Sequence, residues 1–238
     1  MQPRGLLLDY GGTLVEEVGY DPRAGHEWLF ARASYRPSRV TLEDVLNRAD
    51  RVAREVSERR DQFHLEATWP TLTRLIYDFF GIRFDDPMSE LELGFWKTAV
   101  QTRPMPGAGE ALEQFSRSRV PMAVLSNSGF GEHVIRYELD KYGLANRLAF
   151  VMASAEYAVR KPNVLLFETA AARLGIDAKD IWFVGNRLDT DVAGAKAAGM
   201  TAVWFRLPSA RDLPSDHADF IATGWNDLVR RFQESTRP

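Results

Sequence analysis

Short apolar runs recur along this chain, and amphipathic stretches separate most of them. The runs cover residues 6–8, 120–125, 148–152, 180–184, 201–205 and 220–221. A run without polar alternation is typical of a strand buried on both faces, as in a parallel sheet. The stretches between the later runs, residues 109–118, 134–142, 164–174 and 192–198, show helical spacing. Strands that alternate with helices predict an α/β fold whose core is a Rossmann-like, doubly wound parallel sheet.

The region from residue 16 to residue 102 follows a different pattern. Its apolar positions recur at helical spacing from about residue 22 onward, and no convincing strand interrupts them. Thr41 and Asp44 have the spacing of a capping box, which predicts a helix start there, and Gly81 is placed to end another helix. We therefore expect residues 1–15 and 103–238 to form the core domain. Residues 16–102 are expected to form a helical-bundle cap domain inserted after the first core strand.

Composition narrows the class of protein. Of the 238 residues, 45% are hydrophobic and 26% are charged, which is ordinary for a soluble globular protein. The 30 basic and 33 acidic side chains leave a net charge of −3, which favours neither a nucleic-acid nor a membrane surface. The absence of cysteine excludes disulfides and thiolate chemistry. Nothing near the N-terminus resembles a signal peptide, so we expect a cytoplasmic protein. Residues 208–214 are expected to form a surface loop.

Polar residues with chemical potential stand where predicted core elements end. Asp9 directly follows the first apolar run and precedes paired glycines, and Ser126 follows the second run. Lys161 precedes a proline, and residues 186–191 follow a later run. In open α/β sheets, ligands bind at the carboxyl ends of the strands. These residues are therefore predicted to meet at one site, although each type of residue taken alone is also common in turns.

The four segments, in this order, resemble the four motifs of the haloacid dehalogenase superfamily. The family's first motif is a buried strand followed by Asp-x-Asp-Gly-Thr, and its second is a Ser or Thr after a strand. Its third is a Lys, often before Pro, and its fourth is Gly-Asp-x-x-x-x-Asp leading into Gly-Ala-x-x-Ala-Gly. The chain has Asp9-Tyr10-Gly11-Gly12-Thr13, Ser126-Asn127, Lys161-Pro162, Gly185-Asn186-Arg187-Leu188-Asp189-Thr190-Asp191 and Gly194-Ala195-Lys196-Ala197-Ala198-Gly199.

The resemblance implies a role for each matching position. Asp9 would be a nucleophile that forms a covalent intermediate, Ser126 would donate a hydrogen bond to the substrate, and Lys161 would stabilise charge. Three further residues, Asn127, Gly12 and Thr13, are expected to bind the substrate. The family's Mg²⁺ would be bound by oxygen atoms, because hard cations favour them. Its expected ligands are Asp9, the Gly11 carbonyl, Asn186 and Asp191.

Two positions depart from the family pattern. Gly11 replaces the aspartate that protonates the leaving group in family phosphatases, and such a group typically contributes about 10²–10⁴-fold in rate. Asn186 replaces a fourth-motif aspartate and brings an amide oxygen without charge. Only Asp9 and Asp191 remain of the family's four site carboxylates, so the Mg²⁺ site is expected to be weakened.

The departures leave several functions open. The leading interpretation is a phosphatase-type hydrolase acting on a small anionic metabolite through an aspartyl intermediate at Asp9. A metal-independent dehalogenase or another carbon-centred hydrolase is the first alternative, and a catalytically impaired binding or regulatory protein is the second. Phosphonate-cleaving members carry alanine at position 11 but also use a cap lysine, for which only Lys97 is available. Substrate identity and oligomeric state are not readable from the sequence.

Overall fold

The structure, a computed structural model, describes residues 2–210 and 217–235, and its centre is one parallel sheet. The strand order is β5 (Val151–Ala153), β4 (Met122–Ser126), β1 (Gly5–Leu8), β6 (Ile181–Gly185), β7 (Thr201–Phe205) and β8 (Phe220–Ala222). Every neighbouring pair is parallel. The six strands fall on the six apolar runs, so the predicted α/β fold class is confirmed. β5 begins at Val151, three residues after the start of its apolar run at residue 148.

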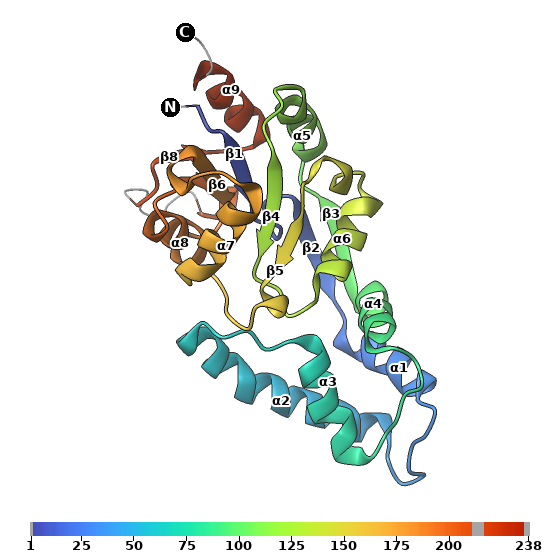
Figure 1. Ribbon diagram of the computed structural model, residues 1–238. Coiled ribbons are helices and arrows are strands. Elements are labelled where there is room, and N and C mark those ends of the chain that lie inside the picture. The colour runs from blue at the N-terminus through green and yellow to red at the C-terminus, as the bar shows by residue number, and fades with distance from the viewer. Residues whose placement is uncertain (1, 211–216, 236–238) are drawn as a thin grey trace.

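Helices cover both faces of this sheet (Figure 1). In β1, Leu6 and Leu8 pack on one face and Leu7 on the other, because successive strand residues point to opposite sides. The first face is covered by α5 (Ala108–Arg117), α6 (Glu132–Lys141) and α9 (Trp225–Ser235), and the second by α7 (Val164–Leu174) and α8 (Ala193–Ala197). The central strand β1 is therefore buried on both sides, which places the residue after it deep in the protein.

Two strands that the sequence pattern did not indicate lead away from the sheet. β2 (Val15–Tyr20) and β3 (Val100–Pro104) pair as an antiparallel ribbon, with a bulge between Glu17 and Gly19. Both strands carry charged or polar residues at neighbouring positions, so neither shows the alternation that marks a half-buried strand. Their pairing joins segments that are far apart in the chain, and local periodicity carries no signal for it.

Between the two ribbon strands lie four helices with a hydrophobic core of their own. They are α1 (Pro22–Arg32), α2 (Leu42–Phe63), α3 (Trp69–Tyr77) and α4 (Met88–Ala99). The predicted capping box is confirmed, because Thr41 accepts from the Asp44 amide while the Asp44 side chain accepts from the Thr41 amide. Gly81, with φ of 69°, ends the short 3₁₀ turn that follows α3. These helices are called the four-helix segment below.

The four-helix segment lies across the carboxyl ends of β4 and β5 (Figure 1). Besides the β2–β3 ribbon, a second connection holds it there. In the linker between α2 and α3, the Glu66 amide donates to the Ala158 carbonyl at 2.9 Å, and the Trp69 amide donates to the Gly129 carbonyl at 2.7 Å. The loop that follows β4 and the loop that precedes α7 therefore both contact this segment.

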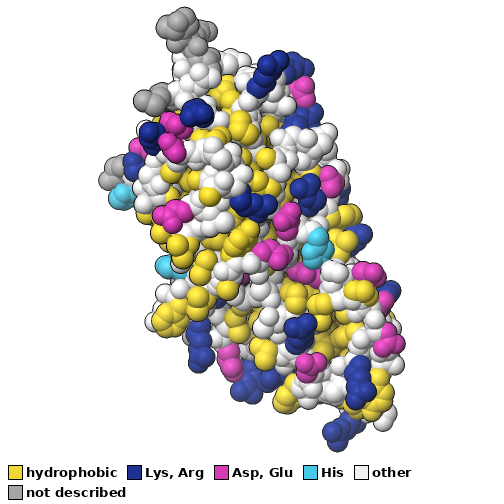
Figure 2. Space-filling model, viewed as in Figure 1, with side chains coloured by type: hydrophobic (Ala, Val, Ile, Leu, Met, Phe, Trp, Pro, Cys, Tyr) yellow, Lys and Arg dark blue, Asp and Glu magenta, His cyan; other side chains and the backbone are white. Residues whose placement is uncertain are grey.

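The surface agrees with the balanced composition. Figure 2 shows basic and acidic side chains interspersed over the visible face, without a field of one sign. No helix among the described residues has the length and apolar character needed to cross a membrane. Of the expected surface loop at residues 208–214, Pro208–Ala210 forms a 3₁₀ turn, and residues 211–214 lie outside the described residues.

Candidate functional site

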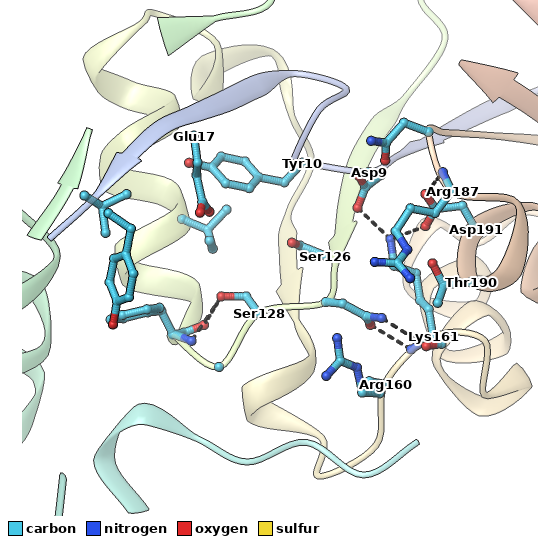
Figure 3. Close-up of a pocket in the computed structure, with 18 of the residues that line it drawn as sticks. Asp9, Tyr10, Glu17, Ser126, Ser128, Arg160, Lys161, Arg187, Thr190 and Asp191 are labelled. Atoms are coloured by element: carbon cyan, nitrogen blue, oxygen red, sulfur yellow. Dashed lines mark hydrogen bonds and ion pairs between the residues drawn. The ribbon is translucent and has the colours of Figure 1, made fainter. Parts of the chain in front are cut away.

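Three buried charged side chains meet at the carboxyl end of the sheet (Figure 3). Asp9 follows β1, Lys161 precedes α7, and Asp191 belongs to the single π turn Leu188–Val192 that follows β6. The Lys161 ammonium lies 2.6 Å from Asp9 Oδ1 and 2.6 Å from Asp191 Oδ1, and it also donates to the Leu125 carbonyl at 2.9 Å. Lys161 is only 1% exposed, so the two carboxylates share one cation that water scarcely reaches.

The electrostatics of this triad follow from burial and from the charge imbalance. Burial raises the pKa of Asp9 to about 6; the Lys161 ammonium opposes this shift and the neighbouring Asp191 carboxylate adds to it. Burial alone would lower the pKa of Lys161, but attraction to Asp191 and Asp9 raises it. One ammonium cannot neutralise two carboxylates, so the triad keeps a net negative charge when both are ionised.

Asn127 and Ser126 complete the end of β4. The Asn127 side chain accepts from the Lys161 amide at 2.7 Å and donates to the Lys161 carbonyl at 3.0 Å, which fixes the backbone that carries the ammonium. Ser126 is 2% exposed, and its hydroxyl points into the open space beside Asp9 (Figure 3). These neighbours place a lysine and a hydroxyl on either side of the carboxylate.

Two glycines of the site, Gly12 and Gly185, are required by the close approach of neighbouring side chains. Gly12 has φ of +73°, and a Cβ built there would lie 2.4 Å from the Asn186 side-chain nitrogen. Gly185 similarly leaves room for the Asp191 side chain, since a Cβ there would lie 2.5 Å from its carboxyl. Thr13 donates to Asp9 Oδ2 at 3.4 Å and is fully buried. Gly12 and Thr13 thus contact site residues without lining the cavity beside Asp9, and their expected contact with substrate stays a prediction.

The donors available for a divalent cation are oxygen atoms. Among the described residues no three His, Cys, Asp or Glu side chains cluster closely enough to hold a metal. Asn186 nevertheless lines the same cavity as Asp9 and Asp191, and its Oδ1 atom is buried and has no hydrogen-bond partner among the described residues. An unpaired buried acceptor beside two carboxylates suits a hard cation such as Mg²⁺ in kind, with little charge to hold it.

A cavity of about 350 Å³ opens in front of the triad. Its walls include all the sequence-predicted site residues except Gly12 and Thr13. Residues that sequence reasoning did not single out also line it: Tyr10, Glu17, Tyr20, Trp96, Phe130, Arg160, Arg187 and Thr190. Three of these residues are next to motif residues in the sequence, so their place in the site could have been predicted: Arg160, Arg187 and Thr190. Glu17 and Tyr20 carry no such signal, because only the β2–β3 ribbon brings them over the strand ends.

The lysine required for phosphonate chemistry lies elsewhere. Lys97 is an exposed residue of α4, and its ammonium sits 4.4 Å from the centre of the Tyr137 ring. It is not among the residues that line the cavity. The structure therefore offers no support for a Schiff base formed by this side chain.

Comparisons with known proteins agree with the geometry. The HAD-hydrolase-like family model matches residues 158–222, which include Lys161, Asn186 and Asp191. Ribulose-1,5-bisphosphate 5-phosphatase of Halopiger xanaduensis is 31% identical over 140 residues, covering 58% of this chain and 57% of that protein. The chain thus spans about half the length of the first curated relatives it matches.

Solved structures extend the likeness in fold to nearly the whole chain. The 2-haloacid dehalogenase from Pseudomonas syringae pv. Tomato DC3000 has a TM-score of 0.68 at 20% identity and covers 98% of both chains. A HAD phosphatase from Thermococcus onnurineus has a TM-score of 0.59 at 20% identity and covers 97% of both. The match to the HAD-hydrolase-like family model, the relatives and the shared fold, together with the triad that converges at the strand ends, make this chain similar to proteins of the haloacid dehalogenase superfamily.

Proposed function

We propose that this protein hydrolyses phosphate monoesters of small metabolites, with Asp9 as the nucleophile. The observation that carries the proposal is the Asp9 carboxylate held 2.6 Å from the buried Lys161 ammonium in the wall of a cavity. A volume of about 350 Å³ suits a small ligand. The curated relatives that match the chain are named phosphatases of small phosphorylated compounds, which supports the same reaction class.

The proposed reaction has two steps. An Asp9 oxygen attacks phosphorus, the bond from phosphorus to the alcohol oxygen breaks, and that oxygen leaves with the electron pair and takes a proton. Water then attacks the aspartyl phosphate, releases inorganic phosphate and restores the carboxylate. Lys161 and the Ser126 hydroxyl stabilise the negative charge on the transferring group. Because Gly11 has no side chain, the leaving oxygen takes its proton from solvent in the cavity, and we expect slow turnover.

We further propose that Mg²⁺ assists this site and that residues 16–102 act as its cap. Asp9, the Gly11 carbonyl, Asn186 and Asp191 would hold the cation, which would offset the repulsion between Asp9 and the phosphate. The cap role is supported by the position of the four-helix segment over the strand ends and by its two connections to the core. A small substrate enclosed there would be shielded from bulk water.

A second candidate is hydrolysis at carbon, of the 2-haloacid dehalogenase type. The observation that favours it is the missing acid at Gly11, because a departing halide needs no proton whereas an alcohol does. In this reaction the Asp9 oxygen attacks carbon, the carbon–halogen bond breaks, and water opens the resulting ester. A protein that only binds a ligand on this fold is the third candidate.

One experiment separates these functions. Purified protein is assayed with a panel of small phosphate monoesters and of 2-haloacids, with added Mg²⁺ and with a chelator, beside the Asp9→Asn variant. We expect phosphate release that needs Mg²⁺ and disappears in Asp9→Asn. Halide release that persists in chelator would establish the carbon-centred reaction instead. No turnover of either panel, with ligand binding retained in Asp9→Asn, would establish a binding protein.

A further inference from the structure

The cavity has a second polar end that the proposed reaction does not use. Figure 3 shows the Tyr10 side chain extending away from Asp9 toward Glu17, so that both lie on the opposite side of the space from Lys161. Tyr10 follows Asp9 in sequence, and Glu17 belongs to β2. Aromatic side chains of Tyr20, Trp96 and Phe130 line the cavity as well. A ligand whose phosphate meets Lys161 would direct its alcohol part into this end.

The Tyr10 hydroxyl is an unpaired buried polar group. The residue is only 2% exposed, and its hydroxyl has no hydrogen-bond partner among the described residues. Leaving a buried hydroxyl without a partner costs about 1–3 kcal/mol, so such groups in native proteins call for an explanation. Burial, with the nearby Glu138 and Glu17 carboxylates adding to it, raises the pKa of Tyr10, so the hydroxyl keeps its proton. The hydroxyl therefore keeps an unused donor and acceptor beside the cavity that Tyr10 lines.

Glu17 is the unpaired charge beside it. Among the described residues, no hydrogen bond or ion pair involves its carboxylate, whereas its neighbour Glu16 is paired with Arg103 at 2.7 Å. Glu17 is exposed to solvent, and desolvation by the surrounding protein, together with the nearby Glu138 carboxylate, raises its pKa. Glu138 itself is satisfied, since it accepts from Lys141 at 2.7 Å and from the Trp96 ring nitrogen at 2.8 Å. This end of the cavity therefore has a carboxylate without a counter-charge from the described part of the chain.

We propose that Tyr10 and Glu17 form a recognition site for the ammonium group of the substrate's alcohol part, so that the preferred substrates are phosphate monoesters of amino alcohols. A carboxylate supplies the counter-charge, the tyrosine hydroxyl accepts one ammonium hydrogen, and the surrounding aromatic rings suit a cation through their faces. In such a substrate the phosphate would meet the Lys161 ammonium, and the amino group would meet the Glu17 carboxylate at the other end of the cavity. This inference rests on the proposed phosphatase function.

The test compares two matched series of substrates. Omega-aminoalkyl phosphates and omega-hydroxyalkyl phosphates, with ethyl to pentyl chains, are assayed for kcat/KM with the native protein. We expect the amine to exceed the hydroxyl compound by about tenfold at the chain length that spans the cavity, as is typical of a hydrogen bond to a charged group. In Glu17→Gln this preference disappears, while turnover of the hydroxyl series is retained. Glu16→Gln is the matched control on the same strand and keeps the preference.

The outcomes separate this inference from the function on which it rests. If neither series is hydrolysed, the phosphatase proposal fails. If both are hydrolysed with equal kcat/KM at every chain length, or if Glu17→Gln keeps the amine preference, the recognition site is refuted and the phosphatase proposal stands. Should Glu17→Gln fold poorly, binding of the aminoalkyl phosphates to Asp9→Asn and to Asp9→Asn with Tyr10→Phe is compared by calorimetry. Equal affinity for the amine and hydroxyl compounds in Asp9→Asn refutes the site.

Discussion

The two ends of the cavity differ in how their charged side chains are paired. At one end the Lys161 ammonium lies 2.6 Å from a carboxylate oxygen of Asp9 and 2.6 Å from one of Asp191, and all three side chains are shielded from water. At the other end Tyr10 and Glu17 line the same space, and neither the Tyr10 hydroxyl nor the Glu17 carboxylate has a partner among the described residues. The first end is organised before any ligand arrives, as a reacting group must be. At the second end the Glu17 carboxylate has no counter-charge from the part of the chain that the structure describes, so a ligand that brings a positive charge can be selected there.

The largest effect is expected at the organised end, from Lys161→Met. This change leaves two buried carboxylates without their cation, and breaking a buried pair in this way typically costs about 3–5 kcal/mol of unfolding free energy. Loss of the charge that stabilises the transferring group should also lower kcat by about 10²–10³-fold. Urea unfolding and steady-state phosphate release measure the two effects. Lys97→Met is the control, since Lys97 is exposed and remote from the cavity, and it should change neither quantity.

The next largest effect is expected from Gly11→Asp, which should raise kcat. A Cβ built at Gly11 meets no atom within 4 Å, so the structure has room for a side chain there. A carboxyl group at this position could protonate the leaving alcohol, and we expect kcat on phosphate monoesters to rise about 10²-fold. Gly11→Ala, which adds the Cβ without the acid, controls for the steric change. An unchanged rate in Gly11→Asp, and also in its combination with Asn186→Asp, would contradict the assignment as a weakened phosphatase.

A moderate effect is expected from pH. Asp9 attacks only as the ionised carboxylate, and its pKa is raised to about 6. Therefore kcat/KM should fall about tenfold per pH unit below that value. Added Mg²⁺ should move this acidic fall of the pH profile to lower pH, because a cation favours the ionised carboxylate. The second pKa of the substrate phosphate is also about 6. The profile is therefore measured with two monoesters of different phosphate pKa, and a limb that follows the substrate would not belong to Asp9.

The smallest effect is expected at the selective end, from Tyr10→Phe. Removing an unpaired buried hydroxyl should leave the unfolding free energy unchanged or raise it by about 1 kcal/mol, because the native protein no longer buries an unsatisfied group. Chemical unfolding of the ligand-free protein measures it, with Tyr77→Phe for comparison, since the Tyr77 hydroxyl is bonded to His26 at 2.9 Å and its loss should destabilise. Destabilisation of Tyr10→Phe by as much as Tyr77→Phe would mean that the Tyr10 hydroxyl has a partner in the native protein.

The fold was largely readable from local pattern. Leu6–Leu8 and the other apolar runs predict buried strands because burial on both faces removes polar alternation, and the helical spacing between them predicts the doubly wound arrangement. The positions of Asp9 and Ser126 at strand ends were readable for the same reason. The ribbon of β2 and β3 was not, because its residues are stabilised by pairing with each other rather than by a local pattern.

The sequence by itself thus determined the sheet, the helices between its strands and the order of the residues that follow those strands. Only the tertiary structure decided which of them meet. Asp9 and Lys161 are 152 positions apart, and their contact depends on the parallel strand order that brings distant strand ends to one edge. The unpaired state of Glu17 was equally hidden, since a carboxylate in a sequence has no partner or exposure until the chain around it is folded. Local periodicity records burial, whereas charge pairing is a property of the packed molecule.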